Sequence, residues 1–449
     1  MSRLDVNSFR HTAGSADNIT LDNSQNATVE GNLTVDGTTT LTGAVELPDD
    51  TVDIADLSAT GTASSSTYLR GDNSWASIST QDTLSFRNLI YNGAMAVCQR
   101  EDSVTGITGS NDGYLVADRW RHTFEDAGTW SVDQAEDAPE GFVNSTKIKC
   151  TSSATLGASA RVYIEQLLEG RDQQHYKYGT SNAESLTLSF WIKSSRTGTF
   201  NAGFVNQGAR SGSPSGTEIA DRATSQLVTI SSANTWEKKT ITFAGDTGAY
   251  IRNNQHKGVG LRLTFNAGSN YTGGSAQSWG SNTSANTYTG TLGLGTATND
   301  DLFLTGVQLE IGTTATVFEV VPYSIELDRC MRYLQVFHKK IGLLMRVHSS
   351  TQALTHIPLF KPMRNLPTYA IVPSGTNYDL LYSGAVLANQ SSGWAFSAGG
   401  ARTGGFELMM TRSSGTFSDI NTVLHANLHH GYGPSNSDFH YFATADAEL

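Results

Sequence analysis

The chain has few residues that cross-link a fold covalently or fix a turn rigidly. It contains three cysteines and nine prolines among 449 residues. Cys98, Cys150 and Cys330 lie far apart among apolar neighbours, so we expect buried free thiols and neither a disulfide scaffold nor a zinc knuckle. Free thiols are typical of proteins that assemble in a reducing cytoplasm.

Charged residues and long apolar runs are also scarce. Only 16% of the residues are charged, and the formal net charge is −12, which disfavours binding to nucleic acid or to an anionic membrane surface. The first twenty residues lack the basic start and apolar centre of a signal peptide, and no window approaches the roughly 20 apolar residues of a membrane span. We therefore expect no nucleic-acid partner, no export signal and no membrane insertion.

Glycine and small polar residues are abundant instead. The chain has 44 glycines and 38% hydrophobic residues, a balance that favours many short strands and turns over helices. A chain of 449 residues normally divides into two or three folded units. The sequence therefore predicts a mainly β protein with more than one domain.

One short segment carries a glycine repeat. Residues 29–45 read VEGNLTVDGTTTLTGAV, in which Gly31, Gly37 and Gly43 alternate with aliphatic residues. A single copy cannot bury enough apolar surface to offset its ordering entropy, whereas chains wound around a shared axis could supply the missing core. The repeat predicts an intertwined trimeric β shaft of at most about 55 Å.

Changes in composition predict four segments. Residues 1–28 are polar, and we expect them to be ordered by docking on another protein. Residues 29–85 form the shaft and a connector rich in small residues. Residues 86–322 form a jelly-roll β-sandwich, with alternating apolar residues predicting strands over 185–193, 240–243, 258–265 and 302–311. Residues 323–449 form a short helix and a smaller β-sandwich knob.

The helix after Pro322 has a capping signal. Ser324 is placed to cap it, and Leu327, Met331 and Leu334 are spaced to form its buried stripe. In the preceding domain, Gln308 and Glu310 alternate with apolar residues, which predicts the polar face of a closing strand.

Several separated stretches resemble bacteriophage tail-fibre and related virion proteins. These are the shaft with TASSSTYLRGDNSWAS, the words NLIYNGAMAVCQR and YLVADRW, the closing word GVQLEIGTTATVFE, and ELDRCMRYLQVF, PLFKPMRNLPT and the terminal ATADAEL. The two opening words and the closing word are similar to the strands that bracket a carbohydrate-binding-like jelly-roll module. The resemblance implies a homotrimer, an N-terminal virion anchor that meets tail or adaptor proteins, and a distal host-recognition part. It implies no catalytic site.

Aromatic residues in polar stretches are candidates for ligand binding. Tyr271, Trp279 and Tyr288 lie in a long Gly/Ser/Asn/Thr run, and Trp394 lies in SSGWAFSAGG. Their rings could stack on the apolar face of a sugar, or they could pack on a neighbouring subunit.

Two charged or titratable groups have a functional and a structural interpretation. Asp118, Arg119 and Trp120 could line a ligand pocket, but a structural ion pair beside a buried Trp is the favoured interpretation. His425 and His429 would share one face of a strand and could ligate a metal around a threefold axis. Surface or interface histidines are favoured, because no Cys or carboxylate stands at ligand spacing; no cofactor is expected.

The sequence favours a non-enzymatic tail fibre that adsorbs the virion to a host-cell surface through multivalent glycan binding. One alternative is a structural tail adaptor or capsid decoration protein without receptor binding. Another is a polysaccharide depolymerase, which is disfavoured because no acidic pair stands out in a predicted groove and β-helical repeats are absent.

Overall fold

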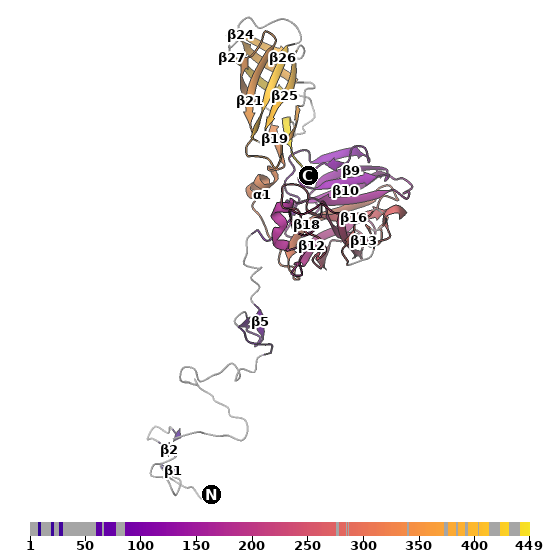
Figure 1. Ribbon diagram of the computed structural model, residues 1–449, viewed down its shortest axis with the longest axis vertical. Helices are drawn as coiled ribbons and strands as arrows, with labels where there is room; N and C mark the ends of the chain where they lie inside the picture. Colours follow the sequence, from indigo (N-terminus) through magenta and orange to yellow (C-terminus); the bar gives the residue numbers. More distant parts are fainter. Residues whose placement is uncertain are drawn as a thin grey trace. The chain divides into compact units, whose positions relative to one another are not determined.

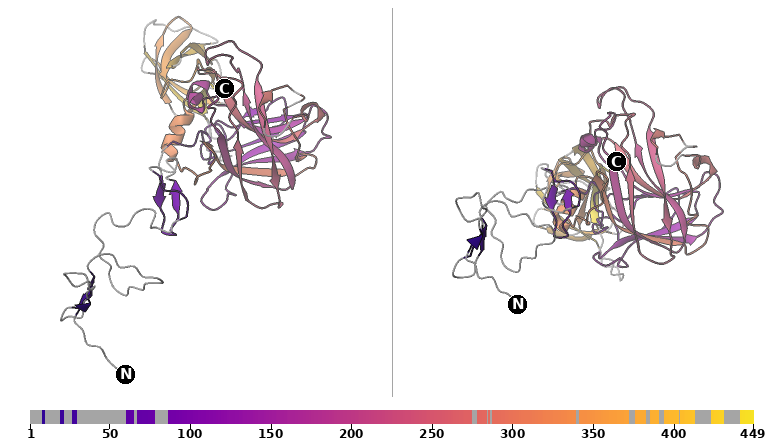
Figure 2. Two further views of the ribbon diagram at one scale, coloured as in Figure 1. Left: turned by 60° about the horizontal axis from the view of Figure 1, so that its bottom comes forward. Right: turned by 90° about the horizontal axis from the view of Figure 1, so that it is seen from below.

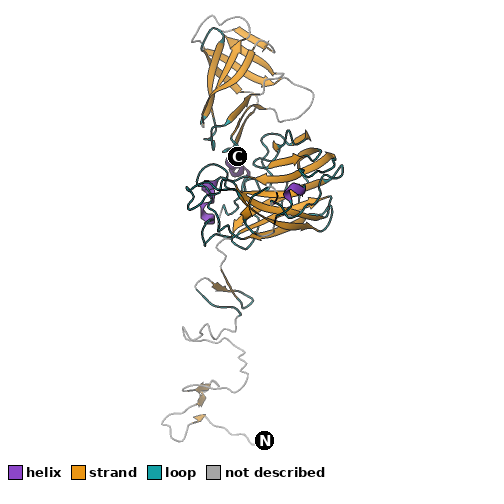
Figure 3. Ribbon diagram, turned by 45° about the vertical axis from the view of Figure 1, so that its right-hand side comes forward, coloured by secondary structure: helices purple, strands orange, loops and turns teal. Residues whose placement is uncertain are grey.

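The computed structural model describes residues 8–9, 19–21, 27–29, 60–64, 67–77, 86–274, 278–283, 285, 287–338, 341–371, 376–382, 385–390, 394–402, 404–412, 423–430 and 441–449. The chain divides into two compact units, Met1–Ser79 and Thr80–Leu449 (Figure 1). Strands make up most of the regular structure in both, which confirms the mainly β prediction (Figure 3).

The first unit contains short antiparallel strands. β1 (Ser8–Phe9), β2 (Ile19–Leu21) and β3 (Ala27–Val29) form one sheet, and β4 (Thr67–Leu69) pairs with β5 (Trp75–Ser77). The β4–β5 turn is held by Asp72, whose carboxylate accepts hydrogen bonds from the backbone and hydroxyl of Ser74. The predicted shaft over 29–45 lies outside the described residues except for Val29, so its trimeric winding stays a prediction.

The second unit begins with a β-sandwich of two antiparallel sheets (Figure 2). The first, called here the β18 sheet, has the order β15-β12-β18-β10-β9-β6, and the second, the β16 sheet, has the order β17-β14-β13-β16-β11-β8-β7. Their bounds are β6 Ser103–Ile107, β7 Gly113–Tyr114, β8 Arg121–Glu125, β9 Thr129–Ala135, β10 Ser145–Ser152, β11 Arg161–Gln166, β12 Leu186–Ser194, β13 Gly198–Asn206, β14 Arg222–Ile230, β15 Glu237–Phe243, β16 Val259–Ala267, β17 Gly280–Ser281 and β18 Asp301–Ile311. Two 3-10 helices, η3 (Gly170–Tyr176) and η4 (Ser269–Tyr271), lie in the connections.

The core between the two sheets is built from alternating apolar side chains. Every second residue of β12 and β16 is an apolar residue of this core, and Phe124 stacks on Trp130 with ring centres 4.8 Å apart. Burying one such side chain stabilises the fold by roughly 1.5–3 kcal/mol. The strands predicted over 185–193, 240–243, 258–265 and 302–311 are confirmed within β12, β15, β16 and β18.

The polar side chains predicted on the closing strand are covered by another segment of the chain. Gln308 and Glu310 are both fully buried, because residues 313–319 fold back over them. The Gln308 side-chain oxygen accepts the Glu319 amide at 2.7 Å, and Glu310 accepts the amide and hydroxyl of Thr316 at 3.0 and 2.5 Å. This polar face is therefore completed by the chain itself.

The predicted opening strand near residue 88 is an irregular segment that runs beside β18. The Leu89 amide donates to Leu309, and the Val307 amide donates to Gly93, each at 2.9 Å. The carboxylate of Glu319 accepts the Asn88 amide at 2.8 Å. The two ends of the sandwich are thus bonded to each other, although the first end is not a strand.

A single α-helix among the described residues, α1 (Tyr323–Cys330), follows the sandwich (Figure 1). Its N-cap is Pro322, and the predicted cap Ser324 is exposed inside the first turn. The predicted buried stripe does not form, because Leu334 is buried in β19 and not in the helix, and Leu327 and Met331 are only half-buried. Glu326 is buried instead, because its carboxylate accepts the backbone amide of Asn92 at 2.7 Å. No helix in the described ranges is long and apolar enough to cross a membrane.

Two further sheets complete the second unit. One has the order β19-β28-β22, and the other has the order β24-β23-β27-β20-β21-β26-β25. The bounds are β19 Leu334–His338, β20 Ile341–Val347, β21 Gln352–Pro358, β22 Thr368–Ile371, β23 Thr376–Tyr382, β24 Ala385–Gln390, β25 Trp394–Arg402, β26 Gly405–Arg412, β27 Val423–His430 and β28 Tyr441–Asp446. Both sheets are antiparallel, as expected for the predicted C-terminal β part.

Buried ion pairs connect these C-terminal residues to the sandwich. Arg119 is fully buried, pairs with Glu448, and has its guanidinium carbon 3.5 Å from the centre of the Tyr333 ring. Glu169 accepts two hydrogen bonds from Arg332 at 2.7 and 2.9 Å. The favoured structural interpretation of Arg119 agrees with this geometry, but its partner is Glu448 and not the adjacent Asp118.

Candidate functional site

The outward-facing side chains of the β16 sheet form a polar surface, called here the outer face. The strand register places Glu165 of β11 between Arg121 of β8 and Arg262 of β16. On β13 and β14 the same face carries Asn201, Gly203, Ser225 and small apolar residues. Since inward and outward residues alternate, the core residues of these strands hold the polar side chains in fixed positions.

An ionic cluster lies at the centre of the outer face. Glu165 accepts from Arg121 at 2.8 Å and from Nε and Nη2 of Arg262 at 2.9 and 2.7 Å. Burial alone would raise the pKa of Glu165, but the two guanidinium groups hold the pKa below its usual range. The ring of Tyr163 lies under Arg262, 4.5 Å from its guanidinium carbon. Charge-assisted, bidentate pairs of this kind fix side-chain geometry.

At one side of this cluster an aromatic ring is open to solvent in part. Tyr271, at the end of η4, is half-buried, and the guanidinium carbon of Arg161 lies 4.6 Å from its ring centre. Arg161 also donates to Glu125 at 2.7 Å, and the Arg161 and Glu125 side chains remain 26% and 39% exposed. The site therefore presents an apolar ring beside hydrogen-bond donors and acceptors.

A polar groove of about 390 Å³ lies along β14 and β17. It is lined by small side chains and glycines, namely Ala223, Thr224, Ser225, Gly273, Ser278, Gly280, Ser281 and Thr287. The groove has hydroxyl groups but no aromatic ring, so it can accept an extended polar ligand without stacking on it.

Two of the predicted loop aromatics have structural contacts. Tyr288 is only 3% exposed, and its hydroxyl oxygen lies 3.2 Å from a guanidinium nitrogen of Arg262. Its ring is thus unavailable for stacking, contrary to the expectation of an exposed loop aromatic. Trp279 is half-buried, donates its ring N–H to the Ala244 carbonyl at 2.8 Å, and packs edge-to-face on Tyr178 with ring centres 5.5 Å apart.

The remaining predicted residues lie in strands whose side chains are outside the description. Trp394 begins β25, and His425 and His429 lie on β27. His425 is paired with Leu344 and Leu381 in the register. Their roles stay predictions. In the part of the chain that the structure describes, no group of three or more His, Cys, Asp or Glu could hold a metal ion.

The outer-face residues that matter most were not found from the sequence. Arg161, Tyr163 and Glu165 occupy alternate positions of RVYIEQ, which is a period-two signal for one polar strand face. Their partner Arg262 is 97 positions from Glu165. Only the strand order brings the two together.

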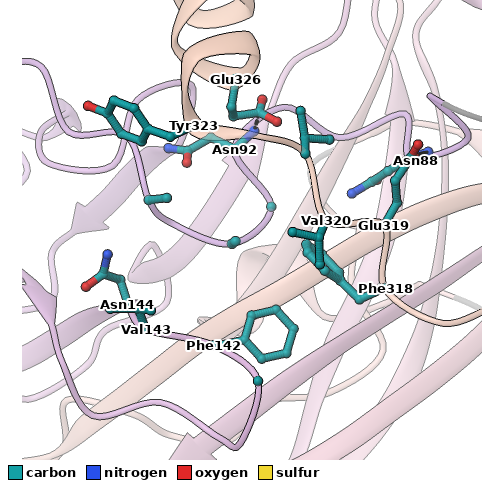
Figure 4. Close-up of a pocket in the computed structure, with 15 residues that line it drawn as sticks. Asn88, Asn92, Phe142, Val143, Asn144, Phe318, Glu319, Val320, Tyr323 and Glu326 are labelled. Carbon is teal, nitrogen blue, oxygen red and sulfur yellow. Dashed lines mark hydrogen bonds between the residues drawn. The ribbon is translucent and has the colours of Figure 1, made fainter.

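A second, apolar pocket of about 200 Å³ lies where the opening segment meets α1 (Figure 4). On one side of the pocket, Phe142 and Phe318 contact each other edge-to-face, with their ring centres 4.9 Å apart. The pocket lining includes three exposed side chains, called here the junction patch, namely Val143, Val320 and Tyr323. The nearby carboxylates of Glu319 and Glu326 are occupied by backbone amides, so this surface suits apolar contact.

No protein-family profile matches the chain, and no curated protein matches it. Among solved structures, the enzymatically active domain of bacteriophage CBA120 tailspike protein 4 is 13% identical, with 50% of this chain and 21% of that chain covered and a TM-score of 0.25. TmCBM61 in complex with beta-1,4-galactotriose is 13% identical, with coverages of 50% and 99% and a TM-score of 0.23. The family 11 carbohydrate-binding module of Clostridium thermocellum is 11% identical, with coverages of 46% and 95% and a TM-score of 0.25. Likeness at this level carries no argument about function.

Proposed function

We propose that this chain is a non-enzymatic, trimeric tail-fibre protein of a bacteriophage, which attaches to the virion through residues 1–28 and binds host-cell glycans. The observation that carries glycan binding is the half-open ring of Tyr271 on Arg161, beside Glu125 and the ionic cluster. Sugars present apolar ring faces and many hydroxyl groups. An aromatic ring with adjacent charged donors and acceptors complements both.

The side chains of the outer face are already held in place, which favours the binding of a ligand that makes only weak contacts. Arg161 and Arg121 are already held by Glu125 and Glu165, so little side-chain entropy is lost when a hydroxyl group docks. Three copies of such a site on one fibre would bind a repetitive polysaccharide by avidity, since each later contact is intramolecular.

Self-association is supported by two features. The glycine repeat at 29–45 needs partner chains to form a core. The junction patch exposes large apolar side chains beside the apolar pocket, with Val143 77% and Val320 80% exposed. Contiguous apolar surface of this kind is typical of a subunit interface, and we assign it to a second copy of this chain.

The carboxylates of the outer face argue against hydrolysis. A glycosidase needs a carboxylic acid whose pKa is raised so that it can donate a proton. The pKa of Glu165 is lowered by its two arginine partners, which keeps it ionised. This favours binding over the depolymerase alternative.

The test is binding of purified full-length protein to surface polysaccharide from the host strain, measured by biolayer interferometry. We expect Tyr271→Ala and Arg161→Ala each to weaken binding about tenfold, equivalent to ~1.4 kcal/mol. Leu366→Ala, an exposed residue outside the β16 sheet, is the control and should bind normally. Shortened polysaccharide chains after incubation would support a depolymerase, and no binding to any host surface fraction would favour the adaptor alternative.

A further inference from the structure

We propose that the Tyr271 site selects neutral sugars over acidic ones, and that Glu125 is the residue that determines this selection. The selection rests on the proposed function, because it names the class of sugar that the same site binds. The observation behind it is the ion pair of Arg161 and Glu125, which are directly opposite each other on the neighbouring strands β11 and β8. Specificity is a difference of two affinities, so a group that opposes one ligand contributes as much as a group that attracts the other.

The Arg161–Glu125 pair leaves one acceptor and one donor open to solvent. Arg161 donates from Nε and Nη2 to the same carboxylate oxygen, Oε2 of Glu125, and the Nε bond is 2.7 Å long. Among the described residues, Oε1 of Glu125 and Nη1 of Arg161 form no hydrogen bond, and neither atom is sealed from solvent. The site therefore offers a ligand one charged acceptor and one charged donor in the same ion pair.

A sugar hydroxyl group matches these two atoms better than a sugar carboxylate does. A hydroxyl group is both a donor and an acceptor, so it can accept from Arg161 and donate to Glu125. An ionised carboxylate can accept from Arg161 but has no proton to donate, so its charge would face the charge of Glu125. Like charges placed together in an interface oppose binding. Glu125 therefore favours a neutral sugar and opposes an acidic one.

The charges around the site do not offset this effect. The other two arginines of the cluster are already paired, because Arg121 and Arg262 both donate to Glu165. Arg121 also lies 3.9 Å from a carboxylate oxygen of Asp112, and Asp126, the residue after Glu125, is exposed. With the ion pair itself, three arginines lie among four carboxylates, so the site has no excess positive charge that would attract an acidic sugar.

The Tyr271 ring is held beside Arg161 by backbone contacts. The Gly268 amide donates to the Ala160 carbonyl oxygen at 2.8 Å, which anchors η4 to the start of β11. A Cβ on Gly268 would lie 2.3 Å from the Ala158 carbonyl oxygen, so only glycine permits this close approach. A sugar that stacks on the ring therefore meets a preorganised ion pair, which reduces the entropy lost on binding.

The test measures binding of matched neutral and acidic sugars to the full-length protein at pH 7 by saturation-transfer NMR. The probes are the methyl glycosides of glucose and glucuronic acid and of galactose and galacturonic acid, because the members of each pair differ only in a hydroxymethyl or a carboxylate group. We expect the wild type to bind at least one neutral probe, about tenfold more tightly than its acidic counterpart. Glu125→Gln keeps the size of the side chain but removes its charge, so the ratio of the two affinities should fall to about two.

Asp126→Asn is the matched control. It removes the same charge one residue away, from an exposed side chain that is not part of the ion pair. Salt screens charges at such a position, so the ratio should stay within about twofold of the wild-type value. Equal falls in Asp126→Asn and Glu125→Gln would overturn the proposal, because net charge alone would then set the selection. An unchanged ratio in Glu125→Gln would overturn it as well.

Tyr271→Ala separates this inference from the proposed function. If this variant loses the neutral probe but the wild type binds the acidic probe equally well, the Tyr271 site stands and only its selectivity is rejected. If the wild type binds neither the probes nor host polysaccharide, glycan binding itself is rejected and the selectivity with it. Binding that survives Tyr271→Ala would reject both the site and its selectivity.

Discussion

The two sheets of the sandwich both carry polar residues on their outward faces, but the faces are completed differently. On the β18 sheet, Gln308 and Glu310 are buried and fully bonded to residues 316–319. On the β16 sheet, Arg161 and Glu125 are partly exposed and lie beside the half-open ring of Tyr271. The first face is closed by the chain, while the second is open only in part, at Arg161, Glu125 and Tyr271.

The comparison indicates that a polar strand face can meet a ligand only where no other segment of the chain covers it. The alternation of polar and apolar residues is the same in β11 and β18. The segment at 313–319 supplies backbone amides to the first face, whereas the loop that holds Tyr288 covers only part of the second. We therefore expect substitutions on the β18 sheet to change stability and those on the accessible side of the β16 sheet to change binding.

Replacing Glu310 should have the largest effect. Glu310→Ala leaves the Thr316 amide and hydroxyl group without their buried acceptor, and we expect a loss of about 3 kcal/mol in the free energy of unfolding. Denaturant unfolding measures this loss. Glu125→Ala, on the accessible face, should lose less than about 1 kcal/mol. Equal losses at the two positions would contradict the comparison.

Acid should affect the β16 sheet through His122, on the inner side of β8. Burial lowers the pKa of His122 to about 4, below its unfolded value, so the unfolded state binds the proton first and stability falls as pH drops from about 6.5 toward 4. By linkage the loss attributable to His122 is about 2 kcal/mol at pH 5. His122→Phe should lack it.

The measurement for His122 is the stability difference between variant and wild type at pH 7 and at pH 5. Burial raises the pKa of Asp118 to about 6, and this group gains stability on acidification in the same window, so the raw wild-type curve combines both. A difference between variant and wild type that does not change with pH would rule out the assignment to His122.

A smaller effect is expected at Glu165, whose folded pKa is lowered. Ionised Glu165 stabilises the folded state fully above the pKa that it has in the unfolded chain. This stabilisation is lost as the pH falls through the pKa of Glu165 in the folded state. Glu165→Gln should lower the free energy of unfolding by about 1–2 kcal/mol at pH 7. Its stability should also fall less steeply than that of the wild type as the pH is lowered. Urea unfolding at several pH values between 7 and 3 would measure both quantities. If the stability of the variant falls with pH as steeply as that of the wild type, Glu165 is not the group that causes the loss of stability in acid.

The sequence predicts much of this fold but little of the site. The apolar core residues of β12 and β16 follow a local period of two, so these strands could be predicted directly from the sequence. The Arg121–Glu165–Arg262 cluster depends on which strands are neighbours, a property of topology that no local pattern contains. Tyr288 is in a polar loop and yet is buried, because tertiary packing places that loop over Arg262.

Hydrogen–deuterium exchange of the full-length protein with and without host polysaccharide tests the central claim most directly. Bound glycan should slow exchange of the amides in β11, in β16 and in the segment around Tyr271, and leave residues 306–319 of the closed face unchanged. Slowed exchange at 306–319 with no change around Tyr271 would contradict the account.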